Sequence, residues 1–362
     1  MKLHILLSQI TLMSNLAFGQ TLPVGIPDPT WQLLFSDEFN DGAINTSLWH
    51  VADEFDHFAA NNIVHIDDNV IESGGNLVLT FKKQNYDCLA APPYNGLPGD
   101  IYFCKRQNLT GLIYNHTGGY VWTKAAYNFK YGYIEARVKL DYAHGLFPAF
   151  WTFLGDDIAT YTNGSEIDIF EMRMGTDPAN IMTCNIHYTY PAADPLDGFA
   201  DPYIGNYDDV WRTFAVEWGP DFIHWYVDGT WVRTYGPPYN GGYHQIHDPV
   251  KVLFDLGIEG LPGQENAPDA STPALVNMYV DYLRVYQLDH DCANAFSTCS
   301  FNYSTYPKTV KESITIGGCA GSVYSVPAGD SQYLHASDFI QINGDFTVPV
   351  GAELLLDVGS CY

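Results

Sequence analysis

Alternating apolar and polar residues recur along the chain between about residues 31 and 287. The runs of strand length are 76–83, 131–140, 166–172, 212–219, 222–234, 250–258 and 276–287. In 131–140, Tyr133, Glu135, Arg137 and Lys139 alternate with Ile134, Ala136, Val138 and Leu140, which predicts a strand with one buried face. No run has the spacing of a long amphipathic helix. The pattern therefore predicts an antiparallel β-sandwich.

A turn signal divides one of these runs. Asp228 and Gly229 stand between Val227 and Thr230, inside an aromatic-rich segment. Asp-Gly between two strand-like runs is typical of a tight β-hairpin, because both central positions need a positive φ.

The composition changes near Asp289. Residues 290–362 contain four of the seven cysteines and no tryptophan, together with further strand-like runs such as Ser313–Gly318. We interpret 290–362 as a small, disulfide-tied β module of unknown role. Two more cysteines, Cys88 and Cys104, flank a loop rich in proline and glycine that a disulfide could close, and the four late cysteines permit three pairings. Cys184 lies in an apolar run and is predicted to be a buried free thiol.

The first 19 residues are typical of a signal peptide. Lys2 is followed by a mostly apolar stretch, and small residues at 17 and 19 suit a cleavage site before Gln20. A buried N-terminal strand or helix is the alternative. We expect a signal peptide over 1–19, a main domain over 20–289 and the small module over 290–362. The mature protein is then secreted or extracellular, or else periplasmic or held at the cell surface.

The charge balance restricts the partners. Asp and Glu number 42 against 16 Lys and Arg, a net charge of −26, while 46% of residues are hydrophobic, enough for a sizeable core. Such a charge repels phosphate backbones and anionic membrane surfaces, so we expect no nucleic-acid partner. No segment beyond the first 19 residues approaches the length of a membrane span, and we expect a monomer.

The segment with the clearest chemistry is Glu166-Ile-Asp-Ile-Phe-Glu171. Side chains alternate along a strand, so Glu166 and Asp168 share one face and Glu171 falls on the other. One bulged residue near Ile169 or Phe170 brings Glu171 to the first face. Three neighbouring carboxylates repel one another, and this repulsion raises the pKa of at least one of them.

Paired carboxylates of this kind suit retaining glycoside hydrolysis. One ionised carboxylate attacks the sugar carbon, and a protonated one, about 5–5.5 Å away, protonates the leaving oxygen. Four residues of regular strand would separate two such groups by about 13 Å, so the bulge and leaning side chains must bring them closer. The alternatives are three acids on a solvated strand face, or a cation site.

The chain also resembles a known family, glycoside hydrolase family 16, in particular its laminarinase-like endo-β-1,3-glucanase branch. The matching segments lie in the family's order and cover roughly 31–288. They are 35–41, 74–80, 117–124, 129–140, 144–155, 164–171, 214–229 and 280–287. The resemblance implies a concanavalin A-like β-jelly-roll sandwich whose concave sheet lines the substrate cleft.

The resemblance implies roles for individual residues. Glu166 matches the nucleophile, Glu171 the general acid/base, and Asp168 the assisting carboxylate between them. The resemblance also places six residues against the substrate: Trp151, His187, Tyr120, Trp122, Trp218 and Arg173. Of these, Arg173 is the nearest basic candidate for contact with a sulfated sugar. Aromatic faces pack on the apolar faces of sugar rings, although core packing is the alternative for each of these aromatics.

The expected function is that of a secreted retaining endo-glycosidase acting on β-1,3- or mixed β-1,3/1,4-glucan. The sequence departs from the branch at Tyr120, where an Arg is common, in 159–163, which lacks Trp and Pro, and in 255–260, where Ala-Val-Gly-Gly is usual. All three departures touch substrate-contacting regions. The alternatives are a galactan hydrolase of the same family, a transglycosylase, and a non-catalytic carbohydrate-binding jelly roll. The negative charge of the chain favours the neutral glucan.

The family often holds one structural calcium ion away from the reaction centre, and no cofactor is expected for catalysis. The matching positions are Glu38, a backbone carbonyl near Gly75, and Asp281. Carboxylate and carbonyl oxygens are suitable ligands for Ca²⁺. Surface acids at strand ends are the alternative.

Overall fold

A computed structural model of the chain describes a set of residues with gaps between them. They are 23–24, 31–51, 63–87, 113–154, 165–188, 203–219, 222–236, 246, 249–260, 263–288, 291–298, 308–318, 324–326 and 331–358. The predicted signal segment 1–19 and the proposed disulfide partners lie outside them, apart from the backbone of Cys292. Cys184 is described, and it is a buried free thiol as predicted.

The described residues form strands and two single 3-10 turns. In chain order they are β1 (Trp31–Asp37), β2 (Trp49–Val51), β3 (Ile63–His65), η2 (Asp67–Asn69), β4 (Val70–Ser73), β5 (Asn76–Asp87), β6 (Ile113–Thr123), η3 (Ala125–Tyr127), β7 (Gly132–Leu140), β8 (Leu146–Phe153), β9 (Ser165–Glu171), β10 (Ile181–Tyr188), β11 (Tyr203–Ile204), β12 (Arg212–Trp218), β13 (Ile223–Val227), β14 (Thr230–Tyr235), β15 (Lys251–Ile258), β16 (Leu275–Leu288), β17 (Asp291–Thr298), β18 (Lys308–Gly317), β19 (Tyr324–Ser325), β20 (Ser331–Asn343), β21 (Phe346–Thr347) and β22 (Glu353–Val358). Each strand-like run of the sequence corresponds to one or two of these strands. Within this described part, no helix is long and apolar enough to cross a membrane.

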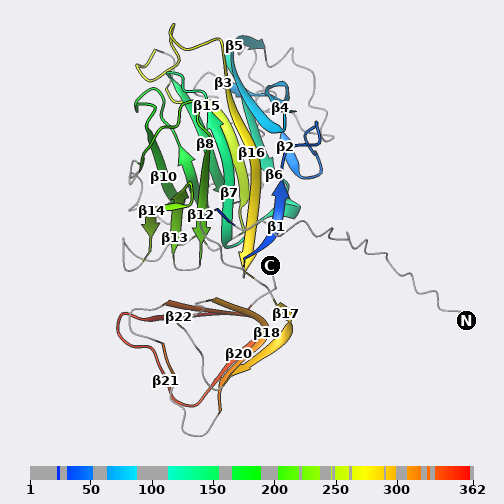
Figure 1. The fold of residues 1–362 in the computed structure, drawn as a ribbon, viewed down its shortest axis with the longest axis vertical. Coiled ribbons are helices and arrows are strands. Elements are labelled where there is room, and N and C mark those ends of the chain that lie inside the picture. Colours follow the sequence, from blue (N-terminus) through cyan, green and yellow to red (C-terminus); the bar gives the residue numbers. More distant parts are fainter. Residues whose placement is uncertain are drawn as a thin grey trace, which may run out of the picture.

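The strands up to β16 belong to one large, mainly antiparallel sheet. Its main path runs β11-β10-β9-β8-β15-β6-β5-β16-β7-β12-β13-β14, with β1, β2, β3 and β4 paired alongside (Figure 1). The sheet curls, so that apolar side chains of β8, β9 and β15 share one core with those of β7, β12, β13 and β16. The all-β expectation is confirmed, and the core lies between two facing halves of one sheet.

The predicted Asp-Gly hairpin joins β13 and β14. Val227 pairs with Thr230, and Asp228 and Gly229 have φ values of 49° and 71°. Both central residues are therefore left-handed, as a type I′ turn requires.

The prediction that β7 buries only one face is wrong for its first half. Ile134, Ala136 and Val138 face the core as expected. Tyr133 and Glu135, on the opposite face, are also fully buried: Tyr133 packs against Trp31, and Glu135 accepts a 3.0 Å hydrogen bond from the backbone N–H of Val24. The alternation of residues separates the two faces of the strand, but it does not show which other segments of the protein cover the second face.

The chain beyond Leu288 forms sheets of its own. β17, β18, β20 and β22 pair in that order, and β19 pairs with β21, all in parallel. Ile314, Ile316, Leu334 and Ala336 form a small buried cluster. The predicted β content of this module is confirmed, and the disulfides stay a prediction.

Candidate active site

A β-bulge lies in β9 at the position where the sequence requires one. On the β8 side, Asp168 pairs with Trp151, Phe170 with Phe150 and Glu171 with Ala149, so that Ile169 is the extra residue. On the β10 side, Ile169 and Phe170 together face one residue, Cys184. The predicted bulge is therefore confirmed against both neighbouring strands.

The bulge sets which side chains enter the core. Ile167, Ile169 and Phe170 are all buried in the main core cluster, although Ile169 and Phe170 are consecutive. Two consecutive inward residues break the alternation, and the face that carries Asp168 receives Glu171 as well. The carboxylates of Glu166, Asp168 and Glu171 thus share one face of the sheet, opposite the core.

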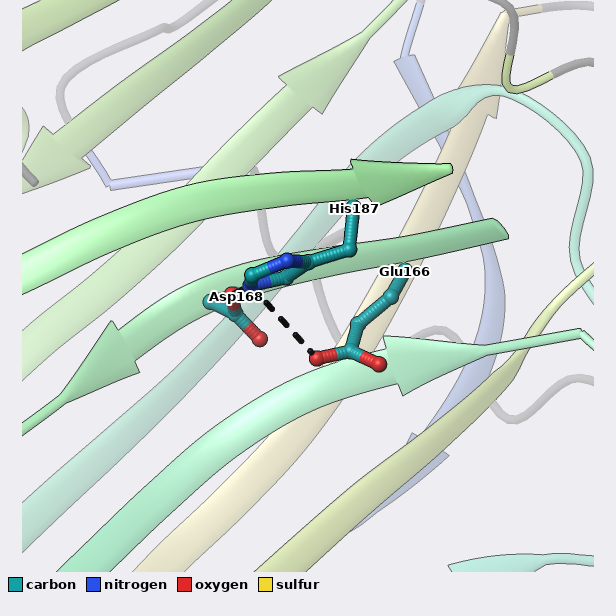
Figure 2. Close-up of side chains that lie close together, drawn as sticks. All are labelled: Glu166, Asp168 and His187. Atoms are coloured by element: carbon teal, nitrogen blue, oxygen red, sulfur yellow. Dashed lines mark ion pairs between the residues drawn. The ribbon is translucent and has the colours of Figure 1, made fainter. Parts of the chain in front are cut away.

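His187 on β10 completes the centre of this group. Its Nε2 lies 3.1 Å from Oδ2 of Asp168 and 3.9 Å from Oε1 of Glu166 (Figure 2). Asp168 is only 1% exposed, while the side chains of Glu166 and His187 are 20% and 35% exposed. The register of β9 and β10 explains why the imidazole lies close to both carboxylates, because His187 pairs with Glu166 and Asn185 pairs with Asp168.

The electrostatics of the group follow from burial and from its mixed charges. Desolvation raises the pKa of Glu166 well above its ordinary value, and the negative charge of Asp168 raises it further, against a lowering by His187. The pKa of Glu171 is also raised well above its ordinary value, first by desolvation and then by Asp168. The hydrogen bond to Asp168 raises the pKa of His187 to about 10, so its imidazole is cationic at neutral pH.

A fourth carboxylate belongs to the same face. Asp255 on β15 pairs with Ala149 of β8, which pairs in turn with Glu171 of β9. Asp255 is fully buried, and its negative charge raises the pKa of Glu171. The family resemblance marks Asp255 only as the first residue of the atypical segment 255–260. The alternation of Lys251, Leu253 and Asp255 in that strand could have placed it on the site face.

The predicted aromatic residues of the site face lie beside these acids. Tyr120, Trp122 and Trp151 form a cluster with Phe153 and Leu253, on the side of the sheet away from the main core. Their exposed fractions are only 0%, 3% and 6%, respectively. The ammonium of Lys251 lies 4.1 Å from the ring centroid of Trp122. The three aromatic side chains thus lie on the face that carries the acids but are covered in this structure, and their contact with sugar stays a prediction.

Trp218 does not line this face, and its assignment as a substrate-binding residue is wrong. It is 0% exposed inside the main core, and its indole N–H donates a 3.1 Å hydrogen bond to the carbonyl of Ile246. Its neighbour Glu217 occupies the outward position of β12, so the alternation of the strand directs Trp218 inward.

Arg173 lies just beyond the acids. Its guanidinium forms an ion pair with Asp177, with 2.9 Å between Nη2 and Oδ2, and its side chain is 45% exposed. Its positive charge lowers the pKa of Glu171. Arg173 is therefore close to the site, while a role in binding a sulfated sugar stays a prediction.

Glu166, Asp168 and His187 could also hold a cation by distance alone. Each offers one ligand atom, and these atoms lie within 4.8 Å of one another. A metal would take the neutral imidazole, so its binding would have to displace the proton whose loss the neighbouring acids oppose by raising the pKa of His187.

The predicted calcium ligands are engaged by arginine side chains. Both carboxylate oxygens of Glu38 accept 2.8 Å hydrogen bonds from Arg284, and Asp281 forms a 2.6 Å ion pair with Arg137. Gly75 occupies the turn between β4 and β5 with a φ of 77°. Carboxylates neutralised by arginine do not fit an oxygen cage for Ca²⁺ in this arrangement, and calcium binding stays a prediction.

Comparisons with known proteins agree with the geometry. The family model for "Glycosyl hydrolases family 16" matches residues 58–284. The chain is 27% identical over 296 residues to the glucan endo-1,3-beta-glucosidase A1 of Niallia circulans, covering 74% of this chain and 40% of that protein. It is 26% identical over 266 residues to the keratan-sulfate endo-1,4-beta-galactosidase of Sphingobacterium multivorum, covering 71% and 56%.

A similar fold occurs in a solved structure, the laminarinase catalytic domain of Thermotoga maritima MSB8. The TM-score is 0.56 with 23% identity, and the match covers 72% of this chain and 99% of that one. The first three curated relatives are longer than this chain, since the matches span only 34%, 40% and 35% of their lengths. The solved structure supports the jelly-roll fold.

Proposed function

Because this chain belongs to glycosyl hydrolase family 16, we propose that it is an endo-acting glycoside hydrolase that cleaves β-1,3- or mixed β-1,3/1,4-linked glucan with retention of configuration. One observation carries the proposal. The bulge at Ile169 brings Glu166, Asp168 and Glu171 to the same face of the sheet. Two carboxylates on one face, here Glu166 and Glu171 with Asp168 between them, can act on a single glycosidic bond as nucleophile and as acid.

In this proposal Glu166 is the nucleophile. The cationic His187, 3.9 Å from its Oε1, opposes the cost of ionising this carboxyl in a desolvated place. Asp168 holds the imidazolium of His187 through the 3.1 Å contact between Oδ2 and Nε2, and its negative charge balances the positive charge of that ring. The ionised Glu166 attacks the anomeric carbon, and the glycosidic oxygen leaves as the glycosyl-enzyme bond forms.

Glu171 is the general acid in the first step and the base in the second. It must carry a proton when the leaving oxygen departs, and the upward shift of its pKa favours that protonated form. Asp255 favours the protonated form of Glu171, because its negative charge adds to that of Asp168 in raising the pKa of Glu171. Water then attacks the anomeric carbon of the glycosyl-enzyme while Glu171 takes a proton from that water, and the bond to Glu166 breaks, which frees the carboxylate.

The glucan assignment rests on the relatives and on charge. A glucan endo-1,3-beta-glucosidase is among the relatives, and a net charge of −26 opposes polyanionic chains. The keratan-sulfate endo-1,4-beta-galactosidase at 26% identity keeps a galactan as the second candidate. Reducing-end release from laminarin, lichenan, agar, porphyran, carrageenan and keratan sulfate tests both. Cleavage confined to the galactans would overturn the glucan assignment.

The Glu166→Gln variant tests the chemistry. Gln fills the same volume and cannot attack the sugar, so hydrolysis is abolished while folding and oligosaccharide binding persist. Full activity of the variant would refute the assignment of Glu166. If the wild-type protein binds glucan and releases no reducing ends, the chain is a carbohydrate-binding module instead. Product analysis with excess acceptor sugar separates hydrolysis from transglycosylation.

We further propose that the protein acts outside the cytoplasm as a monomer. The signal-like pattern of residues 1–19 supports the first statement, on location. Mass analysis of the exported protein tests the location, and we expect a new N-terminus at Gln20. Light scattering tests the monomeric state separately.

A further inference from the structure

The backbone of β9 at the bulge receives a hydrogen bond from the opposite half of the sheet. Trp225 of β13 is 1% exposed, and its indole N–H donates a 2.8 Å hydrogen bond to the backbone carbonyl of Asp168. Asp168 is the residue just before the extra residue Ile169. The indole therefore crosses the core to reach the backbone of β9 at the bulge.

A second donor reaches the strand that faces the bulge. Arg233 of β14 donates from Nη1 to the backbone carbonyl of Cys184, the β10 residue opposite Ile169 and Phe170. Its guanidinium carbon lies 5.3 Å from the ring centroid of Trp225. Figure 1 shows β10 and β14 near each other in the curled sheet. Trp225 and Arg233 form one unit, which we call the bulge clamp.

The need for such a unit follows from the geometry of bulges. An extra residue disrupts the regular ladder, and buried backbone groups beside it require other partners. A strand without the bulge would turn Glu171 toward the core, because a shift of one residue exchanges the two faces. Donors that bond the backbone carbonyls at the bulge stabilise the bulged arrangement.

We propose that Trp225 and Arg233 are positioning residues that hold the bulge of β9 and thereby keep Glu171 on the same face as Glu166 and Asp168. The kinetic part of this inference rests on the proposed hydrolase function. Neither side chain needs to touch the sugar, since both act through the backbone carbonyls of Asp168 and Cys184.

The variant Trp225→Phe removes the indole donor and keeps an aromatic ring in the core. Trp218→Phe is its matched control, because Trp218 is also fully buried and donates its indole N–H to a backbone carbonyl, that of Ile246. Both substitutions create a small void and leave one carbonyl without its indole donor. The comparison turns on the carbonyl, which belongs to the bulge for Trp225 and lies outside it for Trp218.

Two measurements decide between positioning and a merely structural role. We expect Trp225→Phe to lower kcat by at least about ten-fold with KM little changed, because small displacements of catalytic groups reduce the rate strongly. We also expect the pKa of His187, followed by NMR of the imidazole, to fall in Trp225→Phe as Asp168 moves. Trp218→Phe should lower Tm while both quantities keep their wild-type values. Wild-type kcat and wild-type His187 titration in Trp225→Phe, or equal losses in both variants, would overturn the proposal.

Arg233→Met covers the case in which Trp225→Phe does not fold. Met keeps an apolar stem and removes the donor to Cys184. Arg212→Met, which breaks an ion pair with Asp228 near the surface, is its control. We expect the same kcat loss and His187 shift in Arg233→Met alone, and their absence would contradict the clamp.

The two proposals fail in different ways. A wild-type protein that cleaves no polysaccharide would remove the hydrolase function, and the His187 titration would still test the clamp. A wild-type protein that cleaves glucan, with variants that keep both its rate and its titration, would remove the clamp alone.

Discussion

The indole N–H of Trp151 donates a 2.8 Å hydrogen bond to Oδ1 of Asp255, inside the sheet face that carries the acids. Trp151 pairs with Asp168 on one side and with Leu253 on the other. Trp151, which the family resemblance places against the sugar, thus also orients the buried carboxylate of Asp255. The small Ala149 lies between Asp255 and Glu171 in the register, which lets the charge of Asp255 act on Glu171.

Asp255→Asn should move the alkaline limb of the pH–rate profile to lower pH. Asn keeps an oxygen acceptor for Trp151 and removes a negative charge that raises the pKa of Glu171. Loss of that charge favours ionised Glu171, so the acid loses its proton at lower pH. The measurement is kcat/KM for glucan across the pH range.

The acidic limb gives an internal comparison, because Asp255 is not among the main influences on the pKa of Glu166. We expect that limb to stay in place. Asp209→Asn, at a surface ion pair with Lys139, is the external control and should leave both limbs unchanged. An alkaline limb that does not move in Asp255→Asn would contradict the role of Asp255.

Glu171→Gln should inactivate the protein and stabilise it at neutral pH. Because the folded pKa of Glu171 is raised, the folded state binds more protons than the unfolded state above the ordinary Glu value, and stability falls as pH rises through that window. Gln removes this penalty. We expect Tm to exceed that of the wild type by about 2 °C or more at pH 7, with little difference near pH 4. Glu265→Gln, at an exposed position, should follow the wild-type curve, and a Glu171→Gln curve parallel to it would contradict the burial argument.

Gly118→Ala should destabilise the fold, and Gly257→Ala should not. A Cβ on Gly118 would lie 2.4 Å from the carbonyl oxygen of Leu256 and 2.7 Å from Cδ2 of His65. A Cβ on Gly257 would lie 3.4 Å from its nearest neighbour, which is an ordinary contact. We expect a loss of about 1–3 kcal/mol for Gly118→Ala in urea unfolding. Equal free energies of unfolding for the two variants would show that the close approach at Gly118 relaxes freely.

Glu259→Ala should loosen the segment that follows Glu171. Oε2 of Glu259 accepts hydrogen bonds of 2.6 Å and 3.0 Å from the backbone N–H groups of Gly175 and Thr176. Hydrogen exchange at 173–177 should accelerate, and stability should fall by about 1–3 kcal/mol, because these donors lose a charged acceptor. Glu259→Gln keeps one oxygen acceptor and should lie between the wild type and Glu259→Ala. Unchanged exchange in Glu259→Ala would argue against this contact as the support of the segment.

Local patterns sufficed for much of the fold and for the three acids. Alternation marked the strands, Asp228-Gly229 marked the hairpin, and the spacing of Glu166, Asp168 and Glu171 required an extra residue near Ile169. Each of these inferences depends on neighbours within a few positions, where strand geometry is nearly fixed.

Contacts between distant strands were decided only by the tertiary structure. Trp218 is inside, Tyr133 and Glu135 are covered, and Asp255 lies across Ala149 from Glu171. Trp225 and Arg233 reach the bulge from the other half of the sheet. A period of two separates the faces of a strand, but it does not say which face is covered or which residue lies opposite. Those choices depend on how the sheet curls and on the register between strands far apart in sequence, where packing of the whole core determines the arrangement.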